Sequence, residues 1–133
     1  MYLSFYNLSR EPFYVTPDPA FLYPSPTHKE ALAAIVYGVG RRKGFMSIVG
    51  EVGVGKTIVV RSILERTNRK NLLPIYIFNA NISFEELLRA IAQEMGVSCD
   101  GREPFTLVQA LHEALIGEFS RGRNVALVID EAQ

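Results

Sequence analysis

The chain has 133 residues, 48% apolar and 21% charged, a balance typical of one folded domain rather than a disordered segment. Its formal net charge of zero gives no field that would draw it to nucleic acid or an anionic membrane. A lone cysteine excludes an internal disulfide, the N-terminus lacks a signal peptide, and the apolar runs are too short to cross a bilayer. We therefore expect a cytoplasmic domain without membrane contact.

The first 26 residues are rich in proline and aromatic side chains. Prolines at five positions make regular structure unfavourable there. The rings offer much apolar area that is more stable packed against a domain than in water. We interpret residues 1–26 as an extended strap that packs on the domain formed by residues 27–133. Its aromatic residues are Tyr2, Phe5, Tyr6, Phe13, Tyr14, Phe21 and Tyr23.

A helix is expected after the strap, because Thr27 and Glu30 have the spacing of a capping box. Gly38 or Gly40 would end this helix. An apolar stripe with helical period follows the capping box and would form the buried side. The stripe consists of Ala31, Leu32, Ile35 and Val36.

Residues 45–49 are a short apolar run that ends at a glycine, which predicts a strand. A second amphipathic helix is expected to begin near Lys56. This part of the chain is therefore predicted to form a strand, a glycine loop and a helix. The inward residues of the helix would be Val59, Val60, Ile63 and Leu64.

Two further apolar runs, Ile75–Phe78 after Pro74 and Val125–Ile129, are typical of strands buried on both faces. Two helices are predicted between them, each opened by a capping box and ended by a glycine. Alternating strands and helices indicate an α/β fold with a parallel sheet covered by helices. The boxes and glycines are Ser83 with Glu86 and Gly96, then Thr106 with Gln109 and Gly122. The inward stripes would be Leu87, Leu88, Ile91 and Met95, then Val108, Leu111, Leu115 and Phe119.

Residues 50–57 match the P-loop pattern G-x-x-x-x-G-K-[ST] between a predicted strand and a predicted helix. Glycines let successive backbone N–H groups and the helix N-terminus face phosphates. Lys56 would reach the β- and γ-phosphates of ATP, and Thr57 would bind Mg²⁺. The nucleotide-binding residues would be Gly50, Glu51, Val52, Gly53, Val54, Gly55, Lys56, Thr57 and Ile58.

Two adjacent carboxylates follow the last predicted strand, as in a Walker B motif. The C-terminal ends of strands in open α/β sheets are where ligands bind. Asp130 would hold Mg²⁺, and Glu131 would orient and deprotonate the attacking water. Lys56 and Glu131 are thus the predicted catalytic residues.

The remaining candidates lack a supporting pattern. His28 and His112 have no further ligands at metal-binding spacing, so both are interpreted as surface or helix-capping residues. Cys99 is expected to be a half-buried structural thiol. The basic run Arg41–Lys43 is interpreted as a solvated turn, with a phosphate or DNA contact as the alternative.

With these motifs in place, the chain resembles the N-terminal ATPase domain of the general secretion pathway protein A family, in the AAA+ class. The similarity rests on YNLSREPF (residues 6–13), TPDPAFLYPSPTHKEALAAI (16–35), GFMSIVGEVGVGKT (44–57) and VIDEAQ (128–133). It implies a P-loop NTPase sheet of the AAA+/ASCE type and a cytosolic ATPase that forms homo-oligomers. In full-length relatives a lid follows, and often a membrane helix and a peptidoglycan-binding domain, and these proteins help build the type II secretion channel.

The same resemblance implies that the sensor strand, arginine finger and lid come after Gln133. We therefore expect negligible ATP hydrolysis by these 133 residues alone. The implied strand order, 5-1-4-3-2, would place a strand from beyond Gln133 between residues 45–49 and 125–129. Without that strand, we expect the fragment to be marginally stable or self-associating.

The leading hypothesis is an ATPase that energises assembly of a secretion or related envelope system. A transposition helper that binds DNA is an alternative, which the balanced charge disfavours. A helicase is suggested by residues 130–133, Asp-Glu-Ala-Gln, but no DNA-gripping segment lies between the two motifs. A nucleotide-dependent switch without turnover is a further alternative.

Overall fold

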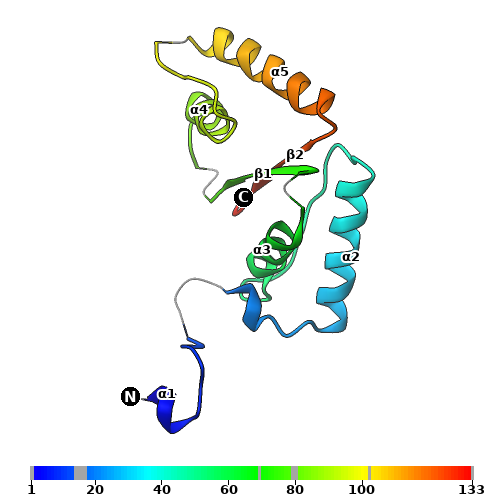
Figure 1. Cartoon of the computed structure of the whole chain (residues 1–133), viewed down its shortest axis with the longest axis vertical. Coiled ribbons are helices and arrows are strands. Elements are labelled where there is room, and N and C mark those ends of the chain that lie inside the picture. Colours follow the sequence, from blue (N-terminus) through cyan, green and yellow to red (C-terminus); the bar gives the residue numbers. More distant parts are fainter. Residues whose placement is uncertain (1, 14–17, 69, 79–80, 102, 133) are drawn as a thin grey trace. The chain divides into compact units, whose positions relative to one another are not determined.

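The structure is a computed structural model that describes residues 2–13, 18–68, 70–78, 81–101 and 103–132. Tyr14 and Pro17 of the strap, and Gln133 at the end of the second motif, lie outside the described residues. The chain divides into two compact units, Met1–Arg66 and Thr67–Gln133, and each is described by itself. Figure 1 labels their helices and strands.

The first unit contains the short helix α1 (Tyr2–Phe5), the 3-10 helix η1 (Pro19–Phe21), α2 (Pro26–Gly40) and α3 (Lys56–Arg66). Within this unit η1 contacts α3, and Arg10 forms an ion pair with Asp18 at 3.3 Å. Several strap side chains are exposed, Phe5, Phe13 and Tyr23 among them. The packing of residues 1–26 as a strap on residues 27–133 therefore stays a prediction.

The N-cap of helix α2 lies two residues earlier than the sequence predicted. Its N-cap is Ser25, whose hydroxyl accepts from the N–H of His28, so the predicted box of Thr27 with Glu30 is wrong. Pro26 explains the difference, because proline is favoured at the first helical position, where its missing N–H costs nothing. The end at Gly40 is confirmed. Of the predicted stripe, Ala31, Leu32 and Ile35 are half-buried and Val36 is exposed.

Residues 45–49 do not form the predicted strand. They have no regular structure, and Phe45 and Val49 are 87% and 91% exposed. A strand persists only when a neighbour satisfies its backbone N–H and C=O groups, and the sheet in the described residues joins only β1 and β2. Met46 lies instead against α2, where a Cβ on Gly38 would come within 2.0 Å of its sulfur. The glycine loop and the helix that follow residues 45–49 are present without this strand.

Helix α3 begins at Lys56, as predicted from the glycine loop before it. Val59 and Ile63 are buried, while Val60 and Leu64 of the predicted stripe are half-buried. Ser62 is also buried, and its hydroxyl donates to the carbonyl of Val59 at 2.9 Å. The helix thereby anchors the C-terminal end of the loop.

The second unit contains β1 (Leu72–Ile77), α4 (Phe84–Glu94), α5 (Pro104–Ser120) and β2 (Asn124–Ile129). The strands pair in parallel, from Leu72 opposite Asn124 to Ile77 opposite Ile129. Strand, two helices and strand in this order confirm the α/β class. The predicted burial is wrong for β2, because Leu127 and Ile129 are exposed in this two-stranded sheet, and Phe78 lies exposed beyond β1.

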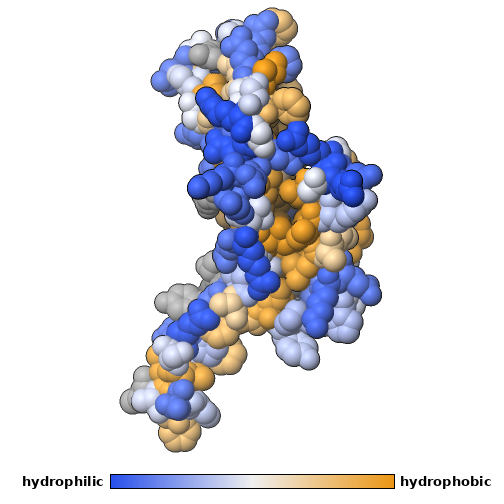
Figure 2. Space-filling view, turned by 45° about the vertical axis from the view of Figure 1, so that its right-hand side comes forward, coloured by the Kyte–Doolittle hydropathy of each residue, from blue (hydrophilic) through white to orange (hydrophobic). Residues whose placement is uncertain are grey.

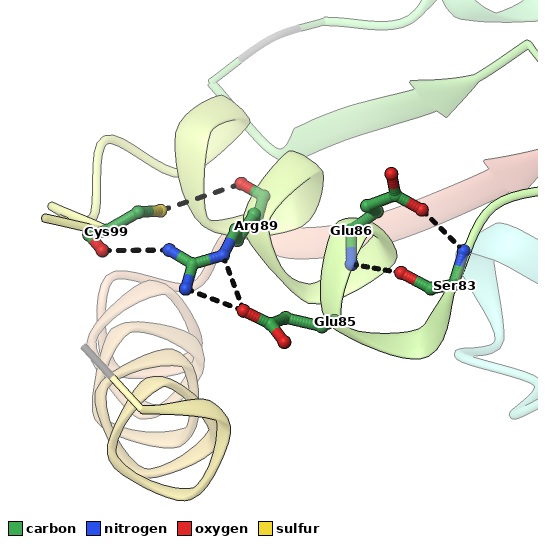
Figure 3. A network of polar contacts seen from close by, with 5 residues as sticks. All are labelled: Ser83, Glu85, Glu86, Arg89 and Cys99. Carbon is green, nitrogen blue, oxygen red and sulfur yellow. Dashed lines mark hydrogen bonds and ion pairs between the residues drawn. The ribbon is translucent and has the colours of Figure 1, made fainter. Parts of the chain in front are cut away.

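Helix α4 confirms the predicted capping box. The Ser83 hydroxyl accepts from the N–H of Glu86, whose carboxylate accepts from the N–H of Ser83 at 2.7 Å (Figure 3). One turn further on, Arg89 donates to the carboxylate of Glu85 and to the carbonyl of Cys99 (Figure 3). These contacts cap the start of α4 and join its middle to the loop that carries Cys99. The core beneath consists of Leu88, Ala92, Leu107 and Leu111, with Ile91, Met95, Val97 and Cys99 against it.

Helix α5 differs from its prediction in both its start and its buried face. It begins at Pro104 after Glu103, and Glu103 makes no side-chain cap, so the box of Thr106 with Gln109 is wrong. Leu107 and Leu111 are buried, whereas Val108, Leu115 and Phe119 are exposed. The helix carries apolar residues on more than one side, so periodicity alone did not define its inner face. Figure 2 shows apolar side chains at the protein surface beside the charged ones.

A buried carboxylate holds the turn between α5 and β2. Glu118 accepts from Arg121 at 2.9 Å and from Arg123, and its side chain is only 9% exposed. The hydrogen bond from Arg123, with the positive charges of both arginines, holds the pKa of Glu118 below its ordinary value, although burial opposes this. A lowered folded-state pKa stabilises the fold above the ordinary value, and this stability is lost as pH falls through the folded-state pKa.

We therefore predict that Glu118→Gln lowers the melting temperature at pH 7. The deficit relative to wild type should shrink as pH falls from the ordinary glutamate pKa to the lowered folded-state pKa, because the unfolded chain binds a proton first and the folded carboxylate is protonated only below the lower value. Thermal melts by circular dichroism between pH 3 and pH 7 would measure this. Glu113→Gln, an exposed position on the same helix, is the matched control. A deficit that does not change with pH would contradict the ion-pair explanation.

Candidate nucleotide-binding site

The loop before α3 adopts backbone conformations that require glycine. Gly53 and Gly55 have φ values of 83° and 90°, in the region that L side chains rarely adopt. The chain turns here and enters α3 at Lys56, whose helix presents first-turn N–H groups without intrahelical acceptors. Such a turn at a helix N-terminus is suited to hold an anion.

Lys56 folds back over the loop that precedes it. Its ammonium donates to the carbonyl of Gly50 at 2.9 Å and to that of Glu51 at 2.8 Å. The side chain is half-buried, whereas the tip of the loop at Val52 is almost fully exposed. Lys56 thereby bridges the two ends of the loop. A bound phosphate could replace the two carbonyls as the partner of its ammonium.

His28 also contacts the loop, which the sequence did not predict. Its Nε2 lies 2.8 Å from the carbonyl oxygen of Val54, and its Nδ1 lies 3.0 Å from the hydroxyl of Ser25. The pair Ser25-Pro26 could have predicted the helix cap, because serine is favoured at the N-cap and proline at the first helical position. No sequence signal relates His28 to a loop 26 residues away. The interpretation of His28 as a helix-capping residue is confirmed, but its ring also contacts the glycine loop.

The two candidate acids follow β2 in the second unit. The N–H of Asp130 donates to the carbonyl of Ile77 on β1 at 2.9 Å, which continues the sheet by one residue. The N–H of Glu131 donates to Oδ1 of Asp130 at 3.1 Å. Glu131 is exposed and has a positive φ of 51°, which is uncommon outside glycine and is often found at functional positions.

Tyr76 on β1 is a further residue that sequence analysis missed. Its hydroxyl donates to Oδ2 of Asp130 at 2.6 Å, a short charge-assisted hydrogen bond. The contact arises because β1 and β2 are parallel neighbours and Tyr76 lies opposite Val128, two residues before Asp130. A partner of this kind orients a carboxylate that binds a metal. A hydroxyl-oriented carboxylate fits Mg²⁺, which prefers oxygen ligands.

The other predicted residues take ordinary structural roles. Cys99 is half-buried and unoxidised, and His112 is exposed on α5. The residues after α2 form a turn, in which the Arg41 guanidinium lies 5.6 Å from the ring centre of Tyr37. Residues 50–58 belong to the first unit, and Asp130 and Glu131 belong to the second. Among the helices the structure describes, none is long and apolar enough to cross a membrane.

A family model described as an AAA domain matches residues 39–133, from the end of α2 through the adjacent acids Asp130 and Glu131. The match includes the glycine loop, Lys56, Thr57, Asp130 and Glu131. It extends over more than two thirds of the chain. The chain therefore belongs to the AAA domain family.

Among curated proteins, the chain is similar to general secretion pathway protein A of Aeromonas hydrophila, with 35% identity over the whole chain. The chain spans 24% of the length of that relative. A shorter similarity, 32% identity over 50 residues, relates 38% of the chain to 7% of the UvrABC system protein B of Prochlorococcus marinus (strain MIT 9211). No solved structure gave a significant match.

Proposed function

We propose that the chain binds ATP with Mg²⁺ through residues 50–58. The observation that carries this proposal is the loop itself: Gly53 and Gly55 at positive φ, followed by Lys56 at the first position of a helix. This arrangement can direct backbone N–H groups and one ammonium at the β- and γ-phosphates. A chance glycine turn would need neither the helix nor the lysine at that position.

Mg²⁺ would be held by the hydroxyl of Thr57 and the carboxylate of Asp130. The hydrogen bond from Tyr76 to Oδ2 of Asp130 supports this assignment, since it fixes the orientation of that carboxylate. The metal would neutralise charge on the phosphates when bound. Glu131 would act as the general base toward water, and its exposed side chain next to Asp130 supports that role.

In the complete gene product, we propose that ATP hydrolysis energises assembly of a type II secretion or related envelope system. The support is the similarity to a protein named for the general secretion pathway. A homo-oligomer and the strand order 5-1-4-3-2 belong to the same proposal. The pairing of β1 with β2 is consistent with that order, in which residues 45–49 are counted as the first strand and β1 and β2, as the second and third, are neighbours.

The test is calorimetric titration of the chain with nucleotides at one fixed ionic strength. We expect saturable binding of one Mg·ATP per chain. AMP should bind at least about tenfold more weakly, because it lacks the phosphates that the loop would hold. Far-UV circular dichroism would verify that the titrated sample is folded. Absence of saturable Mg·ATP binding by a folded sample would contradict the proposal.

A further inference from the structure

His28 joins the start of α2 to the candidate phosphate loop through its two ring nitrogens. Nε2 is 2.8 Å from the carbonyl oxygen of Val54, while Nδ1 is 3.0 Å from Oγ of Ser25 and 3.4 Å from its backbone nitrogen. The ring is half-buried. All of these atoms lie within the unit Met1–Arg66, so the contact is internal to one compact body.

These partners determine where the imidazole proton lies. A carbonyl oxygen can only accept, so Nε2 must carry the hydrogen that binds Val54. In the neutral ring Nδ1 is then an acceptor, and Ser25 supplies two donors to it, the hydroxyl and the backbone N–H. Ser25 thus orients the ring, and the ring presents a donor to the loop. Both nitrogens are satisfied by this one tautomer.

The contact to Val54 fixes one peptide plane of the loop. Because the peptide bond is planar and trans, a carbonyl of Val54 directed at His28 turns the N–H of Gly55 the opposite way. A P-loop binds phosphates through such N–H groups, and each contributes only if it is aimed correctly before the nucleotide arrives. Gly55 has a φ of 90° and no side chain to restrain it, so an outside restraint has a large effect here.

The ring of His28 also packs closely against Gly55. A Cβ built on Gly55 would lie 3.2 Å from Nε2 of His28 and 3.4 Å from Cγ2 of Ile58. The ring therefore lies directly against the backbone of Gly55 as well as bonding to Val54. It restricts the peptide between the two residues from the α2 side.

We propose that His28 is a positioning residue for the nucleotide site. Its Nε2–H holds the peptide between Val54 and Gly55 in the orientation that accepts phosphate, and Ser25 orients the ring. This role rests on the proposed function, because it concerns the same loop. The effect is on nucleotide affinity and is separable from the helix cap that Nδ1 completes.

Three variants of His28 separate the two nitrogens. The amide nitrogen of glutamine is as many bonds from Cβ as Nε2, so His28→Gln keeps a donor for Val54. The side-chain oxygen of asparagine is as many bonds from Cβ as Nδ1, so His28→Asn keeps only the acceptor for Ser25. His28→Ala removes both. Mg·ATP affinity by calorimetry and the melting temperature without nucleotide are the two readouts.

We expect His28→Asn and His28→Ala to bind Mg·ATP about 5- to 10-fold more weakly, the equivalent of one lost hydrogen bond. His28→Gln should stay within about twofold of wild type in affinity and close to it in melting temperature, because glutamine at this position also completes a capping box with Ser25. His112→Asn, at the other histidine of the chain, should bind like wild type. A residue with a merely structural role would instead change affinity and melting temperature together.

Wild-type affinity in His28→Asn, or an equal loss in His28→Gln, would overturn the inference. Lys56→Ala, measured in parallel, shows which proposal has failed. If Lys56→Ala weakens binding and His28→Asn does not, His28 has no positioning role and the proposed function stands. If neither variant weakens binding, the P-loop assignment itself is wrong.

Discussion

Replacing Lys56 by alanine is expected to weaken Mg·ATP binding about 100-fold, which corresponds to roughly 3 kcal/mol. In the free protein the ammonium donates to the carbonyls of Gly50 and Glu51. Binding would exchange these neutral acceptors for phosphate oxygens, and a hydrogen bond between two charged groups is stronger. Backbone N–H groups of the loop cannot replace this charge. Calorimetry at one fixed salt concentration measures the change, because salt screens the attraction.

Lys70→Ala is the matched control for that experiment, since this lysine is exposed outside the loop. It should leave the affinity unchanged. Lys56→Arg distinguishes charge from shape, because the guanidinium keeps the charge but not the compact geometry of the ammonium. We expect it to bind more weakly than wild type. Equal affinity in wild type and Lys56→Ala would remove the basis for assigning residues 50–57 as a P-loop.

Local signals in the sequence were sufficient where the chain itself makes the contact. The capping box of Ser83 with Glu86 is an example, because both hydrogen bonds form within one turn. The helix that begins at Lys56 and the end of α2 at Gly40 were predicted for the same reason. The glycine loop and the two acids were found from short motifs whose spacing reflects local chemistry.

Two helices begin earlier than the capping-box pattern predicts, because a proline lies at the first position of each. Pro26 and Pro104 occupy the first positions of α2 and α5, and each moves the cap to the residue before it. Thr27 and Thr106 had the spacing of N-caps but lie inside their helices. A proline one or two residues before a candidate cap is therefore the better guide to where a helix begins.

Contacts between distant parts of the chain could not be predicted from local pattern. Residues 45–49 have the composition of a strand, but a strand is defined by the neighbour that pairs with it. Tyr76 meets Asp130 only because β1 and β2 are paired in parallel register. His28 meets Val54 only because α2 and the loop fold together within the first unit. Each of these contacts depends on tertiary structure that no single segment encodes.

Replacing Glu131 by glutamine in the complete gene product is expected to retain Mg·ATP binding and to lower turnover about 10²- to 10⁴-fold. The substitution preserves size and removes the carboxylate that would accept a proton from water. Asp130 is the acid that Tyr76 orients, so the metal site should be unaffected. Calorimetry measures the binding, and phosphate release under saturating Mg·ATP measures the turnover.

The comparison with Asp130→Asn tests whether the two neighbouring acids differ in role. If Asp130 holds Mg²⁺, its replacement should weaken Mg·ATP binding, whereas Glu131→Gln should spare binding and slow hydrolysis. The exposed side chain of Glu131, at a residue with a φ of 51°, is consistent with a group that faces water rather than the metal. Glu113→Gln on α5 should change neither quantity. A normal rate in Glu131→Gln would mean that another group activates the water, and weakened binding in that variant would assign Glu131 to the metal instead.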